Sequence, residues 1–362
     1  MNDVTRAQIL AKNERLIAMV IERAKRDFPE DIALIGLTGS FATGDYHEKS
    51  DLDLIIVNDT PRGWEIAVAF ILDDVGYDIY CTPWAPRIED QAALVSPMVG
   101  CLVDLQVLYC AKPEHLARLE SYQQRALAEL KKPIGADCLS RAKKWIGEAK
   151  MALADAQLSE EIGAVRNAAG TVLYNAVNAL VSMNNSYIRR GVKRYLEEIG
   201  EYAHVPEGFT AQYMALVEAN SEAALREAAR ALLGGVIALH EQMWEQFVGK
   251  IVPTRENLRG TYEEFWCNCR NKVLRSTQDG DAVRAFLAAL GAQQYLDEMT
   301  QHVAGTPRFD LMRHFDAADL GVLRREFLAA MERYLDEYRK AGLSVERFDS
   351  FEQLYARFMG GA

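Results

Sequence analysis

The fold of the chain is decided by residues 34–57, which read LIGLTGSFATGDYHEKSDLDLIIV. The first apolar run predicts a strand that leads into a turn at Gly39 and Ser40. A second apolar run predicts another strand, and Asp51 and Asp53 stand where it opens. Because side chains alternate between the two faces of a strand, Asp51 and Asp53 are expected to project to the same side.

The two aspartates predict a metal site. Two carboxylates side by side repel each other unless a cation lies between them, and hard oxygen ligands of this kind suit Mg²⁺. Gly39 permits a tight turn and the close approach of another group. Ser40 adds a hydroxyl beside backbone N–H groups, a combination that can hold phosphate oxygens. A phosphate-binding turn beside a pair of metal ligands indicates phosphoryl or nucleotidyl transfer.

This arrangement resembles the DNA polymerase β-like nucleotidyltransferase superfamily. The superfamily signature is a Gly-Ser turn, a spacer, and then Asp-hydrophobic-Asp-hydrophobic, which stands here as Gly39-Ser40 and residues 50–54, SDLDL. The resemblance covers residues 31–110, and it is nearest to small-molecule enzymes such as kanamycin and streptomycin nucleotidyltransferases. A lone Asp-x-Asp would also suit a hairpin with an acidic, solvated end, but the Gly-Ser turn, Gly44 and the flanking strands favour the transferase.

The resemblance implies transfer of a nucleoside monophosphate from an NTP to an acceptor hydroxyl, with release of pyrophosphate. ATP is the expected donor, and two Mg²⁺ ions are the expected cofactors. It further implies that Asp51 and Asp53 bind the metal ions. Gly39, Ser40 and Ser50 are then expected at the nucleotide.

Two residues compete for the third carboxylate, which superfamily members place on a strand beside the aspartate pair. Asp78 lies in a predicted strand at residues 77–82, after a helix predicted over residues 61–71. Asp104 lies one strand later, in an apolar run at residues 102–109. Chain order favours Asp78, which we expect to bind metal and to act as the general base for the acceptor hydroxyl.

The order of predicted elements indicates an α+β class: a mixed sheet covered by helices, followed by an all-α C-terminal half. An amphipathic helix over residues 5–28 precedes the first strand. We expect a nucleotidyltransferase catalytic domain at residues 1–132, a helical bundle domain at residues 133–252 and a C-terminal helical region at residues 253–362. No purpose for the last region follows from its sequence.

One helix of the predicted bundle carries a polar but uncharged stripe, made of Asn167, Thr171, Tyr174, Asn175, Asn178 and Ser182. Such a stripe suits either an interdomain cleft or a buried set of helix–helix hydrogen bonds, and the sequence leaves both open. After a predicted break at residues 184–187, four basic residues stand within residues 189–194. Lys193 and Arg194 are our candidates for binding the triphosphate, and a solvated basic face is the alternative.

The net charge of −11 is unevenly distributed. Residues 1–130 hold 12 Lys and Arg against 21 Asp and Glu, and the remainder holds 29 against 31. Nucleic-acid affinity rests largely on Lys and Arg, so an acidic catalytic domain disfavours a nucleic-acid acceptor. It suits a small, cationic, aminoglycoside-like acceptor better, although acidity can also serve solubility alone. The alternative is a regulatory enzyme that modifies a protein or RNA, while a catalytically dead nucleotide-binding module conflicts with the intact aspartate pair.

Other features bear on location. The sequence has no apolar run long enough to span a bilayer and no charged-then-apolar leader, so we expect a soluble, cytoplasmic protein without a membrane partner. The six cysteines are scattered, and only Cys267 and Cys269 are close, without a second pair to complete a zinc site. We expect reduced, structural thiols. The acceptor, the base of the NTP and the oligomeric state stay open.

Overall fold

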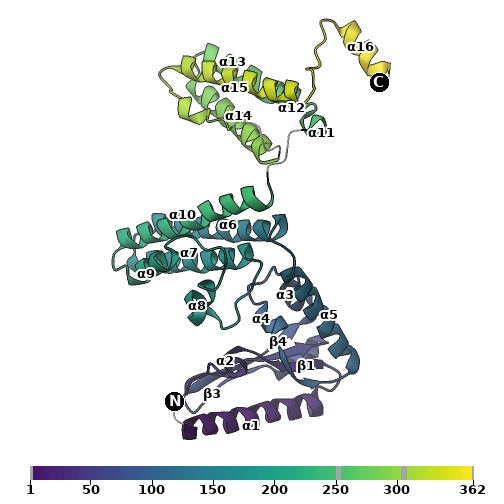
Figure 1. Ribbon diagram of the computed structural model, residues 1–362, viewed down its shortest axis with the longest axis vertical. Helices are drawn as coiled ribbons and strands as arrows, with labels where there is room; N and C mark the ends of the chain where they lie inside the picture. The colour runs from purple at the N-terminus through teal and green to yellow at the C-terminus, as the bar shows by residue number, and fades with distance from the viewer. Residues whose placement is uncertain (1–2, 250–253, 303–307, 361–362) are drawn as a thin grey trace. The chain divides into compact units, whose positions relative to one another are not determined.

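The structure, a computed structural model, describes residues 3–249, 254–302 and 308–360 (Figure 1). The chain divides into a first unit, Met1–Val248, and a second unit, Gly249–Ala362. The predicted α+β class is confirmed, because a five-stranded mixed sheet stands in the N-terminal part and the rest is mainly helical. Among the residues described, no helix is both long enough and apolar enough to cross a membrane.

The sheet has the strand order β3-β4-β2-β1-β5. Its strands are β1 (Ile32–Leu37), β2 (Leu54–Asn58), β3 (Val68–Leu72), β4 (Val75–Pro83) and β5 (Gln106–Cys110). Strands β2 and β4 are parallel, while the other neighbours are antiparallel. The centre of the sheet is therefore β2, which carries the aspartate pair at its start and has β4 as a direct neighbour.

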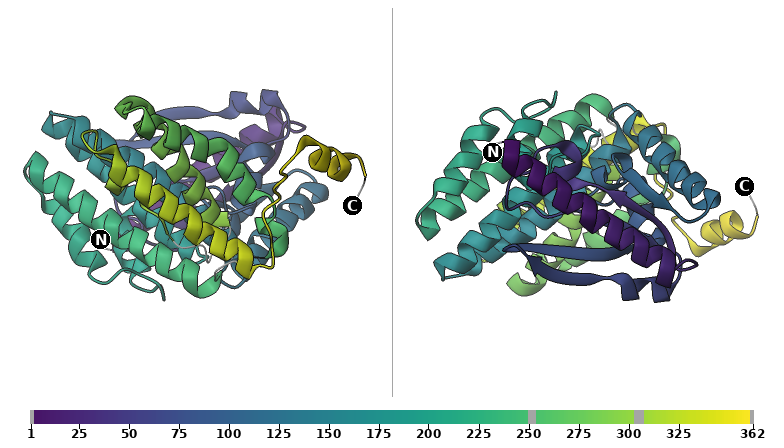
Figure 2. Two further views of the ribbon diagram at one scale, coloured as in Figure 1. Left: turned by 90° about the horizontal axis from the view of Figure 1, so that it is seen from above. Right: turned by 90° about the horizontal axis from the view of Figure 1, so that it is seen from below.

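Helices cover both faces of this sheet. Helix α1 (Asp3–Asp27) lies along one face, as Figure 2 shows from below. It packs through Leu16, Val20 and Ala24, because residues four apart share one helix face. The other face packs on α5 (Pro113–Leu130) and two short helices, α3 (Glu89–Ala92) and α4 (Gly100–Val103). Residues 3–130 together are called the sheet lobe below.

The predicted helix over residues 61–71 is wrong beyond its first turn. A 3₁₀ helix, Pro61–Ile66, is followed by strand β3, which forms a hairpin with β4. The two loop residues, Asp73 and Asp74, have positive φ angles of 52° and 58°, as a two-residue hairpin turn requires. Asn-Gly or Asp-Gly is the usual sequence there, so an Asp-Asp pair gave no hairpin signal. The predicted strand at 77–82 is confirmed as part of β4.

The predicted strand over residues 102–109 is wrong in its first half. Helix α4 ends at Val103, and the N–H of Asp104 donates to the carbonyl of Gly100 at 3.0 Å, a helical bond. Strand β5 begins only at Gln106. Leu102 and Leu105 are both buried, so packing of this turn against the sheet outweighs the strand propensity of Val103.

The remainder of the first unit is a helical bundle, residues 136–247. Its long helices are α6 (Ala136–Leu158), α7 (Ile162–Met183) and α10 (Glu222–Phe247), which share one core with the shorter helices α8 (Tyr195–Ile199) and α9 (Phe209–Glu218). Helix α7 ends where the sequence predicts a break. The predicted boundary at residues 132–133 falls in the connection between α5 and α6, and the one at 252–253 lies outside the described residues.

Asn185 joins the sheet lobe to the bundle. Its amide nitrogen donates to the carbonyls of Glu129 at 2.8 Å and Lys132 at 3.1 Å, at the end of α5. Its amide oxygen accepts a 2.6 Å hydrogen bond from Arg141 on α6. Asn is among the few residues besides Gly that tolerate the left-handed φ of 45° found here. One buried side chain thus fixes where the bundle leaves the lobe.

The second unit is helical. Its helices are α11 (Arg255–Leu258), α12 (Thr261–Phe265), α13 (Asn271–Gln278), α14 (Ala282–His302), α15 (Leu320–Lys340) and α16 (Phe351–Met359). The core is aromatic: Tyr262, Phe265, Phe327 and Tyr334 are all at most 2% exposed and their rings contact one another. The hydroxyl of Tyr334 donates to Thr261 at 2.8 Å, which satisfies a buried polar group.

Candidate active site

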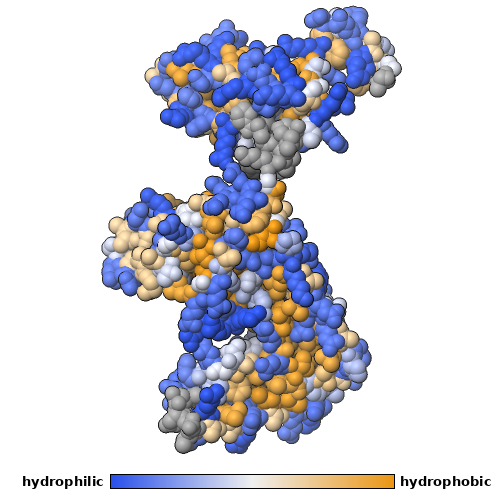
Figure 3. Space-filling model, in the orientation of Figure 1, coloured by the Kyte–Doolittle hydropathy of each residue, from blue (hydrophilic) through white to orange (hydrophobic). Residues whose placement is uncertain are grey.

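A cavity of about 1060 Å³ is lined by residues from both the sheet lobe and the bundle. Figure 3 shows a hollow between these two parts of the first unit, with hydrophilic residues on the bundle side. The lobe contributes the predicted turn and aspartate pair, and the bundle contributes residues 188–193. The sequence motif and the basic segment therefore face one cavity.

The predicted turn at Gly39 and Ser40 is the start of a short helix, α2 (Gly39–Thr43). Gly39 has a φ of +70°, and a Cβ atom there would collide with the carboxylate of Asp53. The backbone N–H of Ser40 hydrogen-bonds this same carboxylate. Glycine is thus required twice at position 39, once for its backbone conformation and once for space.

Asp51 and Asp53 both line the cavity, just before β2 begins at Leu54. Leu52 between them is 3% exposed and lies in the core. Side chains therefore alternate between the core and the cavity in the extended segment before the strand, as predicted for Asp51 and Asp53. Burial raises the pKa of Asp53, and the charge of Asp51 raises it further. Two repelling carboxylates of this kind suit a divalent cation.

The aspartate pair has no third metal-binding side chain close beside it among the described residues. Within residues 3–249, 254–302 and 308–360, no three Asp, Glu, His or Cys side chains are gathered closely enough to hold a metal ion. Asp51 and Asp53 are therefore the two carboxylates that would bind a metal ion at this site. Magnesium ordinarily keeps waters and binds through one or two carboxylates plus substrate phosphates, so a pair fits its chemistry.

The structure places the two candidates for the third carboxylate differently. Asp78 is exposed on β4, two residues before Tyr80, which pairs with Ile55 of β2, and Asp78 is not among the residues that line the cavity. Asp104 follows α4, lines the cavity, and accepts a 3.1 Å hydrogen bond from the hydroxyl of Tyr187. Asp78 is thus on the strand beside the aspartate pair, and Asp104 is on a helix end; the choice between them stays a prediction.

Ser50 lies in the loop between α2 and β2 and lines the cavity. Its hydroxyl accepts a 3.0 Å hydrogen bond from the N–H of His47, and its own N–H donates to the carbonyl of His47 at 3.0 Å. In this structure Ser50 therefore closes a local turn that leads to Asp51. Its predicted contact with the nucleotide stays a prediction.

Two cavity residues were not found by sequence reasoning. Burial raises the pKa of the Tyr80 hydroxyl to about 12, with further contributions from Cys101 and Asp53. Burial also raises the pKa of the Cys101 thiol, and the charge of Asp53 adds to this effect. Both groups stay protonated at neutral pH, which makes them hydrogen-bond donors beside Asp53. A single Tyr in a strand and a single Cys in an apolar run carry no motif that would have marked them.

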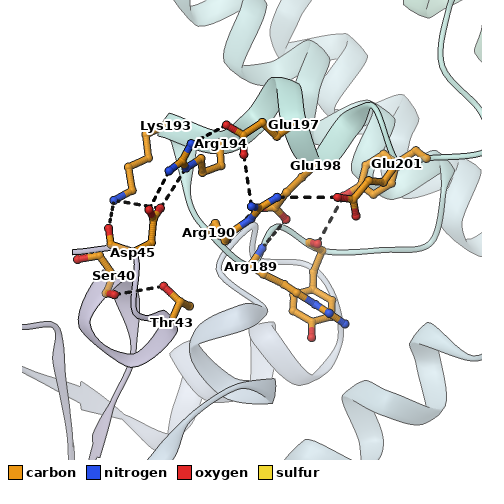
Figure 4. Close-up of polar contacts among 12 residues, drawn as sticks. Ser40, Thr43, Asp45, Arg189, Arg190, Lys193, Arg194, Glu197, Glu198 and Glu201 are labelled. Carbon is orange, nitrogen blue, oxygen red and sulfur yellow. Dashed lines mark hydrogen bonds and ion pairs between the residues drawn. The ribbon is translucent and has the colours of Figure 1, made fainter. Parts of the chain in front are cut away.

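The two basic candidates, Lys193 and Arg194, lie at the mouth of the cavity but in different roles. Lys193 lines the cavity, and its charge lowers the pKa of Asp53. Arg194 is not among the lining residues and instead makes a two-bond ion pair with Asp45, at 2.8 and 3.0 Å (Figure 4). Contact of either residue with the triphosphate stays a prediction.

The polar stripe of α7 divides between the two alternatives. Asn175, Asn178 and Ser182 are buried, and the amide of Asn178 donates to the carbonyl of Tyr174 at 2.9 Å. Tyr174 itself is 37% exposed and lines the cavity, whereas Asn167 lies on the surface. Only one residue of the stripe therefore faces the cavity.

The bundle wall of the cavity also carries acidic groups. Glu198 is 8% exposed at its side chain and accepts the N–H groups of Arg189 at 2.8 Å and Arg190 at 2.7 Å. Glu201 is 77% exposed at its side chain and lines the cavity, 3.9 Å from Arg190. Glu198 thus fixes the backbone of the basic segment, while Glu201 leaves an accessible carboxylate opposite the lobe.

The family profile described as "Nucleotidyltransferase domain" matches residues 17–109. This part of the chain is similar to nucleotidyltransferase domains. The match contains α2, the aspartate pair, and strands β1 to β5 almost to their end, so the predicted resemblance to the polymerase β-like superfamily is confirmed for this part of the chain. The helical bundle and the second unit lie outside the match.

One solved structure is similar along most of the chain: a nucleotidyltransferase-like protein from Exiguobacterium sibiricum. It is 10% identical, with a TM-score of 0.35, and the similarity covers 92% of this chain and 94% of that chain. Among curated proteins, no match was found. The family match over residues 17–109 indicates the reaction class, and the acceptor has to be argued from the cavity.

Proposed function

We propose that the protein transfers AMP from ATP to a hydroxyl group of a small, cationic, aminoglycoside-like acceptor. The observation that carries this proposal is the two-sided lining of the cavity. One side has the aspartate pair and the turn at Gly39 and Ser40. The other side has Glu201 and Tyr174 from the bundle. Pockets for small ligands have volumes of about 300–1,000 Å³, so the volume of about 1060 Å³ accommodates a nucleotide together with a small acceptor.

The nucleotide is placed against the lobe side. Ser40 offers a hydroxyl at the start of α2, and Lys193 offers a cation from across the cavity, 45% exposed at its side chain. Lys acts on phosphates as a mobile point charge. When bound by Asp51 and Asp53, Mg²⁺ would neutralise the triphosphate and stabilise the charge that develops during transfer.

The acceptor is placed against the bundle side. Accessible carboxylates recognise ammonium groups through charge-assisted hydrogen bonds, and Glu201 is the accessible carboxylate of this wall. Asp104 adds a second carboxylate, held by Tyr187. An amine-rich acceptor would give both carboxylates an ammonium partner, which a neutral or anionic acceptor cannot supply.

The proposed reaction is one displacement at the α-phosphorus. The acceptor oxygen forms a bond to this phosphorus, and the bond from phosphorus to the oxygen that bridges to the β-phosphate breaks. Pyrophosphate leaves with that electron pair, and the hydroxyl proton passes to Asp78, our candidate base. The backbone N–H of Ser40 hydrogen-bonds the carboxylate of Asp53 and would hold it in place during this step.

The test is an incubation of the purified protein with each ribonucleoside triphosphate, Mg²⁺ and one acceptor at a time. Acceptors include aminoglycosides, neutral sugars of similar size, tRNA and unrelated proteins. We expect pyrophosphate release with ATP and an aminoglycoside, and a mass increase of the acceptor by one AMP. The matched control is Asp53→Asn, which should release none.

The outcomes separate the alternatives. Transfer to tRNA or to a protein, without transfer to any small acceptor, would replace the proposal by a regulatory nucleotidyltransferase. Equal transfer to neutral sugars and to aminoglycosides would remove the role given to Glu201 and Asp104. Preference for another NTP would correct the donor alone.

A further inference from the structure

A charged contact joins the two sides of the cavity at its mouth. Asp45 of the sheet lobe accepts hydrogen bonds from Arg194, Nε at 3.0 Å and Nη2 at 2.8 Å, and lies 3.5 Å from Lys193 Nζ. Lys193 Nζ also donates to the backbone carbonyl of Asp45 at 2.9 Å. Figure 4 shows these side chains meeting above Ser40. We call the contact of Asp45 with Arg194 the latch.

On the lobe side, the latch is tied directly to the turn at Gly39 and Ser40. Asp45 follows Gly44, which ends α2 with a φ of 76°. The N–H of Asp45 donates to the carbonyl of Ser40 at 2.9 Å, and the hydroxyl of Thr43 donates to the same carbonyl at 3.2 Å. Any movement of Asp45 is therefore passed to Ser40 through one turn of backbone.

On the bundle side, the latch is tied to a fixed segment. Arg194 directly precedes α8, and Tyr195 at the start of that helix is buried in the bundle core. Glu197, one turn further on, accepts another hydrogen bond from Arg194, which is 2.6 Å long. The bonds from the N–H groups of Arg189 and Arg190 to Glu198 hold the preceding loop. The guanidinium of Arg194 is thus presented to Asp45 on a rigid support.

Arg194 and Lys193 interact with the Asp45 carboxylate to different extents. The hydrogen bond from Arg194, followed by the charge of Lys193, lowers the pKa of Asp45 to about 2. Arg194 has both acidic partners already and does not line the cavity, whereas Lys193 does. Arg194 is thus the closer charged partner of the Asp45 carboxylate, at 2.8 Å, and Lys193, which lines the cavity, is the more distant one, at 3.5 Å.

We propose that Arg194 is a positioning residue for the nucleotide: through Asp45 it holds Lys193 opposite the turn at Gly39 and Ser40. The proposal rests on the nucleotidyl transfer proposed above. Loss of Arg194 has two consequences. The segment that carries Lys193 is then no longer tied to the turn at Gly39 and Ser40. Lys193 also becomes the only basic side chain of this segment that pairs with Asp45, so its ammonium group is drawn toward Asp45 and away from the nucleotide.

The experiment measures Mg·ATP binding by calorimetry, without acceptor, for Arg194→Gln, Asp45→Asn, the double variant and Arg194→Lys. We expect Arg194→Gln to raise the Kd about fivefold, the upper end for a partly exposed ion pair. The double variant should bind no worse than Arg194→Gln, since removal of Asp45 releases Lys193. Arg194→Lys should recover part of the affinity. The matched control is Arg230→Gln, which removes the same charge from an exposed ion pair on α10.

The readout separates positioning from stability and from the proposed function. A Kd for Arg194→Gln equal to that of Arg230→Gln would overturn the proposal, as would effects of the two single variants that simply add in the double variant. A melting temperature that falls while the Kd stays constant would show a purely structural latch. Binding of Mg·ATP is measured without acceptor. If no acceptor were modified, the proposed function would be contradicted, but the binding test of Arg194 could still be interpreted.

Discussion

At the scale of single residues, the electrostatics of Asp53 ties catalysis to stability. Its raised pKa means that burial and Asp51 make the ionised carboxylate unfavourable in the folded protein. We expect Asp53→Asn to reduce nucleotidyl transfer by a factor on the order of 10³ or more, since metal-bound charge stabilisation is worth several kcal/mol. Without divalent cations the variant should melt at the same or a higher temperature. Pyrophosphate release and thermal melting check both parts, and near-parental transfer would refute the metal assignment.

The same residue gives a pH prediction with a definite sign. For an acid whose folded pKa lies above its ordinary value of 3.8, the folded state binds more protons than the unfolded state. The stability of the metal-free protein therefore falls as the pH rises from 3.8 through the raised pKa. Asp53→Asn has no such group to ionise. The difference between its melting temperature and that of the parental protein should therefore increase across this pH window and stay constant above it. Parallel melting curves over the whole range would contradict this.

The third carboxylate is decided by a pair of isosteric variants. Asp78→Asn should slow the chemical step by a factor on the order of 10² or more, the low end of what a positioned base supplies. Asp104→Asn keeps an oxygen that can accept from Tyr187 and should do much less. Single-turnover rates at saturating nucleotide separate chemistry from binding. The reverse ranking would assign the base to the helix end after α4.

At the scale of elements, the meeting of the turn at Gly39 and Ser40 with the aspartate pair at one cavity was predictable from sequence, because the information for it is local. Gly39, Ser40 and the aspartate pair lie within fifteen residues of each other, and their spacing alone indicated the site. Strand β3 was not predictable in the same way. It is an exposed edge strand, so its apolar residues do not alternate between buried and exposed positions. Its Phe70 ring stacks on Tyr77 of β4, with 5.3 Å between the ring centroids. Pairing with β4 outweighs the helical spacing of Trp64, Val68 and Ile71.

Two glycines of α2 provide a controlled test of the turn. Gly39 and Gly44 have similar φ angles, +70° and +76°, but a Cβ atom at Gly44 meets nothing within 4 Å. Each change to Ala should cost about 1 kcal/mol of stability for the left-handed conformation. Only Gly39→Ala also displaces the carboxylate of Asp53, so it should lose most of its transfer activity while Gly44→Ala retains it. Equal activity of the two variants would show that the contact with Asp53 does not matter.

At the scale of the whole molecule, the uneven charge predicts how acceptor binding responds to salt. The sheet lobe is acidic, and exposed charges are screened beyond roughly 8 Å at physiological ionic strength. The KM for a cationic acceptor should rise about threefold between 0.05 and 0.5 M salt, as is typical of exposed ion pairs. The KM for any neutral acceptor that reacts should stay nearly constant. Steady-state kinetics with both acceptors at each salt concentration tests this, and a flat response for the cation would leave the acidic balance without a role in binding.

The limits of sequence prediction are clearest at this scale. The basic segment was noticed for its charge, but its assignment to Asp45 depends on a contact between residues 149 positions apart. No spacing rule reaches so far along a chain. The apolar faces of α6 and α7 predicted a bundle. They did not predict that the loop after α7 would return to the sheet lobe.

That separation of 149 residues has a consequence during synthesis. A ribosome that adds about 5–20 residues per second needs roughly 7–30 s to travel from Asp45 to Arg194. During this interval the sheet lobe already carries Asp51 and Asp53, yet the chain has not made the cation that faces them. On the proposed assignment of the metal and the nucleotide, a nascent chain would bind metal ions before it could bind a nucleotide. Nucleotidyl transfer would then begin only after the segment that follows α7 has been synthesised and Arg194 has paired with Asp45.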